Sequence, residues 1–198
     1  MRTTVLIVAT ATLLIGCQST LFSPAIYSVK KSEDKFSKTA ALTYSSENNL
    51  VAEKPILGKT YTGDHGLYIN PRIQRNDKGE INLITLNIIN ISDNPRRPDY
   101  AVVKPLGMLR EIIFRIDDSN VIQLKLISGF NDTERKRTGM TSLTQAQFKS
   151  IAFAQAIALK VRGTSGSTTY EDTEIMGSFK ENLKNFYTQY IVNNAAEG

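Results

Sequence analysis

The segment from Ile81 to Ile91 sets the strongest constraint on the fold of this chain. Its apolar residues fall on both of the faces that the alternation of a β-strand produces. One face carries Ile84, Leu86 and Ile88, and the other carries Ile81, Leu83, Ile89 and Ile91. A strand that is apolar on both faces has to be covered on both sides. We therefore expect this segment to be a central strand of a sheet.

The residues before this strand predict that it is one arm of a hairpin. Leu67–Arg75 has the pattern of a strand, and Asn76–Gly79 has the composition of a tight turn. Pro71 lies within the first arm and has no backbone amide to donate, so this arm should lie at a sheet edge or contain a bulge. A weaker alternation over Phe36–Tyr44 indicates a further strand upstream.

A second hairpin is predicted farther along the chain. Arg110–Ile116 and Val121–Ile127 alternate apolar and polar residues, and Asp117–Asn120 separates them. Strict alternation is typical of a half-buried antiparallel pair, with one face on the core and one in solvent. The polar segment that follows, Gly129–Gly139, is predicted to be a loop.

The last third of the chain predicts a helix and then a third hairpin. Thr144 with Gln147 forms a capping box, which marks the start of a short helix. Period-two alternation then predicts a strand over Ala156–Arg162 and a returning strand over Thr168–Asp172.

A terminal helix completes the predicted fold. Ser178 with Glu181 forms a second capping box at its start. Its apolar stripe consists of Phe179, Leu183, Phe186, Tyr187, Tyr190 and Ile191. Hairpins and helices in this order predict an α+β domain, an antiparallel sheet of about five to seven strands with two helices packed on one face.

The N-terminus predicts export and a lipid anchor. Arg2 precedes an uncharged apolar run, Val5–Ile15, which has the length of the apolar part of a signal peptide and is too short to span a bilayer. The run ends in Leu14-Ile15-Gly16-Cys17, which resembles the lipobox of bacterial lipoproteins. The resemblance implies that the signal peptide, residues 1–16, is removed. It also implies a diacylglyceryl thioether on Cys17 and an acyl chain such as palmitate on the new amine.

The same resemblance also implies where in the cell envelope the protein is located. Two or more acyl chains hold a protein stably on a membrane, whereas one chain binds only marginally. Gln18 follows the cysteine, and by analogy with enterobacterial sorting a residue other than Asp at this position favours the outer membrane. We expect the folded domain to face the periplasm, with display on the cell surface as the alternative.

Composition limits what the rest of the chain can form and bind. Removal of residues 1–16 leaves 182 of 198 residues and takes away Arg2, so 23 basic and 19 acidic side chains remain, a net charge of +4. This length suits one domain, and with Cys17 as the only cysteine we expect no disulfide. We predict a lipidated, flexible tether over residues 17–35 and a single α+β domain over residues 36–198. Anionic lipid head groups are a more natural partner for the charge than nucleic acid, which we do not expect as a partner.

Few residues suggest catalysis. His65, the single histidine, lies in Gly63-Asp64-His65-Gly66, which is typical of a turn, although a hydrolase triad would have to use it as base. Zinc sites need several His or Cys ligands, and only His65 remains once Cys17 is lipidated. The chain contains no phosphate-binding or dinucleotide motif. We predict a protein that is not an enzyme, with no metal and no cofactor beyond its covalent lipid.

Two basic clusters are candidate binding residues. Arg96 and Arg97 form one, and Arg135, Lys136 and Arg137 form the other, each in a predicted loop. They would contact an anionic group such as a lipid phosphate, a glycan or an acidic protein. Solvated loop charge is the explanation that we favour, and the anionic contact is the alternative.

The leading interpretation is an envelope lipoprotein anchored in the outer membrane. Its periplasmic domain would act as a non-catalytic binding or assembly module, with another envelope protein or complex as its partner. Two alternatives stay open: a tethered hydrolase that acts on envelope material, and a surface-displayed adhesin or colonisation factor. The sequence predicts no particular small-molecule ligand.

Overall fold

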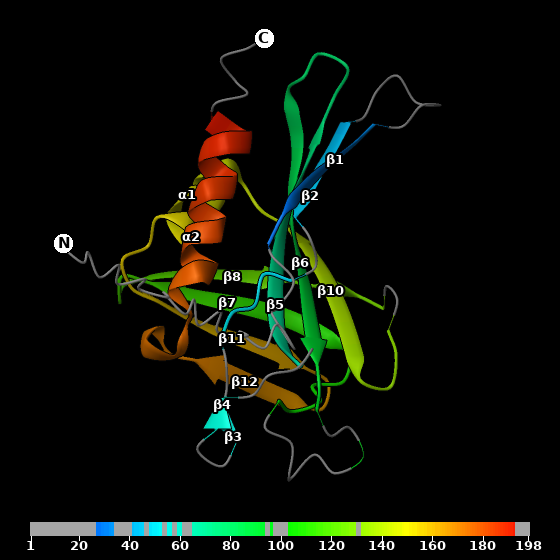
Figure 1. Cartoon of the computed structure of the whole chain (residues 1–198), viewed down its shortest axis with the longest axis vertical. Helices are drawn as coiled ribbons and strands as arrows, with labels where there is room; N and C mark the ends of the chain where they lie inside the picture. The colour runs from blue at the N-terminus through cyan, green and yellow to red at the C-terminus, as the bar shows by residue number, and fades with distance from the viewer. Residues whose placement is uncertain are drawn as a thin grey trace, which may run out of the picture.

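The computed structural model describes residues 27–33, 41–45, 48–52, 55–56, 59–60, 65–93, 96, 103–129 and 132–192. In this part of the chain, antiparallel strands pack with two α-helices, so the predicted α+β class is confirmed. The prediction has one sheet, whereas the described strands divide between two main sheets and a short ladder of β3 (Pro55–Ile56) with β4 (Lys59–Thr60). Figure 1 shows the larger sheet upright, the smaller sheet crossing below it, and the helices beside both.

The larger sheet is built around the strand that the sequence predicts to be apolar on both faces. Its strand order is β1-β2-β5-β6-β10-β9. β6 pairs with β5 on one side and with β10 on the other, so its central position is confirmed. The strands are β1 (Val29–Glu33), β2 (Ala41–Ser45), β5 (Gly66–Arg75), β6 (Ile81–Ile91), β9 (Ile127–Ser128) and β10 (Lys136–Ser142).

The two faces of β6 are covered to different extents. Ile84, Leu86 and Ile88 on one face are all buried in the core. On the other face Ile89 is buried, whereas Leu83 is 40% exposed near the start of the strand. Cover on both sides is therefore complete only toward the end of β6.

Pro71 lies where β5 changes its partner. β2 pairs with β5 only as far as Arg72, and the irregular segment 49–51 bonds to Leu67 and Ile69 instead. Within the described residues, Pro71 therefore has no strand partner on this side, and its missing amide removes no ladder bond there. The predicted edge position is wrong, because β5 is an interior strand of the sheet, although its pairing with β6 is irregular between Gln74 and Arg75.

The smaller sheet contains the two other predicted hairpins. Its order is β12-β11-β7-β8. Leu126 alone separates β8 from β9 in the larger sheet, so the chain passes from one sheet to the other within one bent segment. The Leu126 amide donates to the carbonyl of Arg110 at 2.8 Å, which holds the bend against β7. The strands are β7 (Leu109–Ile116), β8 (Asn120–Lys125), β11 (Ile157–Gly163) and β12 (Gly166–Tyr170).

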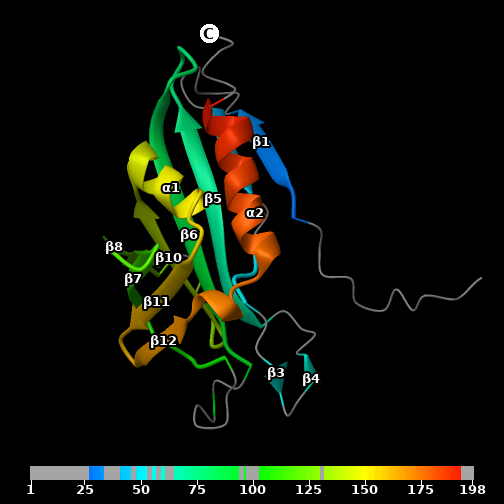
Figure 2. The same ribbon diagram turned by 90° about the vertical axis from the view of Figure 1, so that its left-hand side faces the viewer.

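The helices close one side of the molecule. α1 (Gln145–Ala152) begins at the predicted capping box, in which the Gln147 amide donates to the Thr144 hydroxyl at 3.1 Å and the Thr144 amide donates to the Gln147 side chain at 2.9 Å. α2 (Gly177–Phe186) continues as the π-helical segment η3 (Tyr187–Val192). Figure 2 shows α1 and α2 lying over β5 and β6, with β1 on the far side of α2.

Both sheets and both helices contribute to one apolar core. The predicted strand faces meet there, including Phe114 of β7, Leu159 of β11 and Ile69 of β5, each at most 1% exposed. The stripe of the terminal helix is confirmed as the cover, because Phe179 and Leu183 are buried in the same core. The packing therefore follows from the apolar faces that the sequence presents.

Two boundaries of the predicted strands and loops are corrected. β1 lies within residues 17–35, so residues 29–33 are a strand and not part of a flexible tether. β10 begins at Lys136, inside the predicted loop Gly129–Gly139. Its sequence of Lys, Arg, Thr, Gly, Met, Thr and Ser shows no apolar alternation, which is why the pattern did not predict it.

The start of the terminal helix is also corrected. α2 begins at Gly177 with Met176 as its capping residue, rather than with Ser178, and no side chain caps it. A capping box closes instead between Glu171 and Glu174, at the short 3-10 helix η2 (Asp172–Glu174). The predicted box of Ser178 with Glu181 is therefore wrong.

We expect two glycine-to-alanine substitutions to have opposite effects on stability. A Cβ at Gly163 would lie 2.1 Å from the backbone oxygen of Leu106, so Gly163→Ala forces the strand or the loop to move and should cost about 1–3 kcal/mol. A Cβ at Gly177 meets nothing within 4 Å at the start of α2, so Gly177→Ala should stabilise by about 0.5–1 kcal/mol. Urea unfolding of both variants measures the difference, and equal stabilities would contradict it.

Candidate binding site

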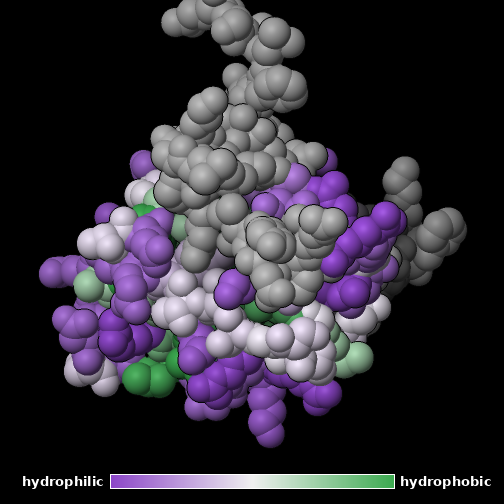
Figure 3. All heavy atoms as spheres, turned by 90° about the horizontal axis from the view of Figure 1, so that it is seen from below, coloured by the Kyte–Doolittle hydropathy of each residue, from purple (hydrophilic) through white to green (hydrophobic). Residues whose placement is uncertain are grey.

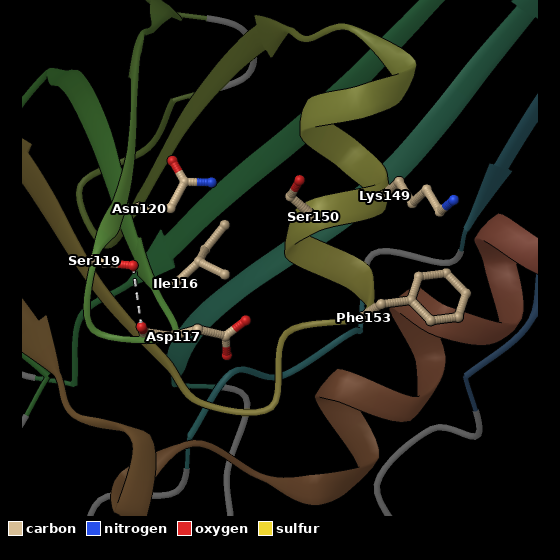
Figure 4. A pocket seen from close by; sticks show the side chains of 7 residues that line it. All are labelled: Ile116, Asp117, Ser119, Asn120, Lys149, Ser150 and Phe153. Atoms are coloured by element: carbon tan, nitrogen blue, oxygen red, sulfur yellow. Dashed lines mark hydrogen bonds between the residues drawn. The ribbon is translucent and has the colours of Figure 1, made fainter.

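An open pocket lies between the tip of the β7–β8 hairpin and α1. It has a volume of about 350 Å³. In Figure 4, Asn120 and Ser150 face each other across the hollow above Ile116, while Lys149 and Phe153 point away from the hairpin toward α2. The pocket is thus polar at its walls and apolar at its floor. Its lining consists of Ile116, Asp117, Ser119, Asn120, Lys149, Ser150 and Phe153.

The hairpin tip has an unusual backbone for its sequence. Asp117 and Asp118 have φ angles of 48° and 60°, in the left-handed region that glycine favours. Asp tolerates this region better than most residues but still carries some strain there. The strain is offset at Asp117, because one oxygen of its carboxylate accepts hydrogen bonds from the amides of Gln155 and Ala156, both at 3.0 Å.

A second carboxylate holds the same connection between α1 and β11. Asp172 accepts a hydrogen bond at 2.8 Å from the amide of Ile157, the next residue after the pair held by Asp117. Lys180 of α2 donates to Asp172 and to the carbonyl of Gln155. The β7–β8 tip, η2 and α2 therefore all contact one short segment between α1 and β11. We call residues 155–157 the carboxylate-held connection.

These contacts set the charge state of Asp172. The hydrogen bond from Lys180, and then that from the Ile157 amide, lower the pKa of the Asp172 carboxyl. The carboxylate is therefore ionised in the folded protein at neutral pH.

The lining of the pocket is mainly polar and uncharged. Its polar groups are hydroxyls, an amide and one carboxylate, which are suited to hydrogen-bonding a small polar group, while the Lys149 ammonium points away from the hairpin. Asp117 commits one carboxylate oxygen to the backbone. Among the described residues, no group of three His, Cys, Asp or Glu side chains could hold a metal ion.

The structure places Arg96, from the first predicted basic cluster, near the second cluster at one end of the larger sheet. Arg96 forms an ion pair at 3.1 Å with Glu134, the neighbour of Arg135. Both side chains are exposed, so this pair contributes at most about 1 kcal/mol. Arg135 donates at 3.2 Å to the carbonyl of Ser92, just after β6. Seen from below, the described residues are a mixture of hydrophilic and intermediate residues with a few hydrophobic ones (Figure 3).

Of the other predicted site residues, two lie in a strand and two lie outside the described residues. Lys136 and Arg137 begin β10, and the Arg137 guanidinium donates to the carbonyl of Thr133. Cys17 and Arg97 lie outside the described residues. The basic clusters are therefore partly engaged in holding the loops of the sheet.

His65 lies beside the second basic cluster. Burial lowers the pKa of His65, Arg135 lowers it further, and Asp93 partly offsets both. Asp93 accepts a hydrogen bond at 3.0 Å from the amide of Val103 and so helps to hold the loop after β6. The histidine is thus neutral at pH 7, at the entry to β5.

Sequence reasoning missed the pocket. Turn preference alone accounts for Asp117 in the sequence, and no motif marks Lys149 or Phe153 as part of a site. Phe153 is 45% exposed at the end of α1. An aromatic residue directly after the apolar face of a predicted helix was the available signal.

Comparisons with known proteins identify no relative: no family model matches the chain, and no curated protein or solved structure shows significant similarity to it. In the part of the chain that the structure describes, no helix has the length and apolar character needed to cross a bilayer.

We expect the two aspartates at the hairpin tip to respond differently to the same change. Asp117→Gly and Asp118→Gly both relieve a left-handed backbone and both add freedom to the unfolded chain. Only the first removes two hydrogen bonds to backbone amides, so it should be less stable than the second by about 1–3 kcal/mol. Thermal and urea unfolding compare the two variants, and equal values would mean that the carboxylate contributes nothing.

The lowered pKa of Asp172 predicts a loss of stability in acid. The unfolded chain binds a proton to this carboxyl more readily than the folded protein does, so its contribution is complete above about pH 4 and is lost as the pH falls through the folded pKa. Asp172→Asn should remove this part of the acid dependence, and Lys180→Met should reduce it. Urea titrations from about pH 7 to about pH 3 test this. An unchanged acid dependence in both variants would contradict the assignment.

Proposed function

We propose that this chain is an outer-membrane lipoprotein whose folded domain acts in the periplasm as a non-catalytic binding or assembly module for another envelope protein or complex. The observation that carries the proposal is the sequence Leu14-Ile15-Gly16-Cys17, with the only cysteine of the chain at the position that lipidation requires. A thioether-linked diacylglycerol together with an N-linked acyl chain gives stable anchoring, at about 0.8 kcal/mol per buried methylene.

The described domain supports a binding role rather than chemistry. Asp117 and Asp172 use carboxylate oxygens to hold backbone amides, and Arg135 holds the carbonyl of Ser92. Side chains committed in this way stabilise a surface instead of reacting with a substrate. The open pocket beside α1 has the hydroxyl and amide groups that a protein partner uses for hydrogen bonding.

A finer description of the fold belongs to the same proposal. We take the two main sheets as one strongly bent antiparallel sheet with both helices on its inner face. The single residue between β8 and β9 supports this reading, because the two sheets are then continuous through Leu126.

The anchor is tested by substitution at the two residues that define it. We expect the native protein to fractionate with outer membranes and its residue 17 to carry lipid in mass spectrometry, whereas Cys17→Ser should abolish the lipid mass. Gln18→Asp is the matched control, because it keeps the lipid and should redirect the protein to the inner membrane. A native protein with residue 17 unmodified, or with residues 1–16 still attached, would refute the proposal.

The binding role and its compartment need separate measurements. Cross-linking and co-purification from detergent-solubilised membranes should recover a defined envelope partner, whereas recovery only as a free monomer would count against the role. The domain should resist protease added to intact cells; digestion under that condition would support surface display instead.

A further inference from the structure

A continuous run of aromatic rings crosses the helical side of the domain. Phe153 contacts Tyr187 with ring centroids 5.5 Å apart, and Phe186 contacts Tyr190 at 5.3 Å. Phe148 joins these pairs, at 6.0 Å from Tyr187 and 6.1 Å from Phe186. The inner rings are buried, but Phe153 is 45% exposed. The run therefore supports an apolar side chain that projects into solvent from a rigid base.

Lysines lie at both ends of this run. The ammonium of Lys184 is 5.7 Å from the ring centroid of Phe153, and that of Lys31 on β1 is 6.0 Å from the ring centroid of Tyr190. Lys149 precedes Phe153 by four residues, about one turn of α1. Exposed aromatic residues flanked by lysines are typical of proteins that bind at the surface of a bilayer.

The composition of the helical side agrees with this character. β1, α1, α2 and η3 together contain five lysines and two carboxylates, and Lys180 is paired with Asp172 of η2, so the net charge with that third carboxylate included is +2. Val192, at the end of η3, adds a second large apolar side chain that is 45% exposed. The lysines are Lys30, Lys31, Lys149, Lys180 and Lys184, and the carboxylates are Glu33 and Glu181.

The chain reaches this side of the domain directly from the proposed anchor. Tyr27 lies ten positions after Cys17, a length of chain that can span at most about 36 Å. β1 follows at once, and Val29 packs against the core beside the helices. Figure 2 shows β1 next to α2 on this side of the molecule. A lipid on Cys17 would therefore keep this side within reach of the bilayer.

We propose that the helical side of the domain docks on the surface of the membrane that holds its lipid anchor. Phe153 and Val192 enter the head-group region, and Lys31, Lys149 and Lys184 meet anionic lipid phosphates. This inference rests on the proposed function and specifies how the anchored domain is oriented. The pocket and the hairpin tip then lie at the border of the docked face.

The outer face of the smaller sheet is the competing basic surface. Its arginines are largely neutralised by neighbours, because Arg162 pairs with Glu111 at 3.0 Å and Arg115 pairs with Glu171 at 2.9 Å. It also carries an exposed apolar residue, Val121, which is 59% exposed. A substitution at Val121 is therefore the natural control for one at Phe153.

The chain has no tryptophan, so a single introduced tryptophan reports its own surroundings. We would reconstitute the full lipidated protein as Phe153→Trp and as Val121→Trp in vesicles of phosphatidylcholine with phosphatidylglycerol, with brominated acyl chains as quencher. Fluorescence from Phe153→Trp should shift to the blue and be quenched, and that from Val121→Trp should not. Quenching at neither position, at both equally, or at Val121→Trp alone would overturn the proposal.

A charge substitution tests the lysines, and each variant is compared with its own fluorescence in the absence of vesicles because Lys184 lies against the ring at position 153. In the Phe153→Trp background, Lys149→Gln and Lys184→Gln should each weaken docking about fivefold, which corresponds to about 1 kcal/mol. Vesicles of phosphatidylcholine alone should abolish the difference. Unchanged quenching in both variants on anionic vesicles would overturn the role of the charges.

The anchor and the docking face fail in different ways. A residue 17 without lipid refutes the proposed function, and the full chain added to the same anionic vesicles still reports whether Phe153→Trp is quenched. A lipidated protein with solvent-exposed tryptophan at 153 refutes the docking face and leaves the anchor standing.

Discussion

The domain depends on the burial of one apolar stripe, which α2 and η3 place against the sheets. Phe179, Leu183, Phe186 and Ile191 are each at most 1% exposed. Burial of a single side chain of this kind stabilises a fold by about 1.5–3 kcal/mol, so the four together outweigh any one polar contact in the described structure. The inner faces of β5, β6, β7 and β11 would be left open to water without this cover.

Apolar burial does not by itself fix how two elements are oriented. The hydrogen bonds of the carboxylate-held connection fix this orientation. Asp117 and Asp172 fix three successive amides, those of residues 155–157, by hydrogen bonds of defined geometry. The connection lies between α1 and β11, so its position sets how the helix lies relative to the smaller sheet. The same contacts shape the pocket, because Asp117 and Phe153 are both part of its wall.

The helical side of the domain offers a rigid shape and positive charge, and this agrees with the binding role that we propose. An anchored module needs a surface that is held rigidly and presented in one orientation. The aromatic run from Phe153 to Tyr190 gives rigidity, and the lysines around it give attraction to an anionic surface. Binding by such a surface requires no reactive group, and the ionisable side chains of the described site mostly hold backbone.

Local interactions made much of the fold predictable. The alternation in β6, β7 and β11 and the capping box of Thr144 with Gln147 lie within a few residues of chain, so the sequence alone determined those elements. β10 was missed because its position is set by the partners on either side, β6 and β9, rather than by an apolar pattern of its own. The cap predicted at Ser178 failed for a related reason: the Met176 amide donates to the carbonyl of Val51, which fixes the start of α2 from outside the helix.

The sequence by itself determined the class of the domain and the apolar faces of its main strands and helices, and it predicts an anchor at Cys17. Only the tertiary structure determined which partners its polar side chains contact. Asp117 meets Gln155 across 38 positions of sequence, Arg96 meets Glu134 across the same number, and Lys31 meets Tyr190 from nearly opposite ends of the described chain. Apolar periodicity is a property of one segment, whereas a hydrogen bond or an ion pair needs two groups whose distance is set by the folding of everything between them.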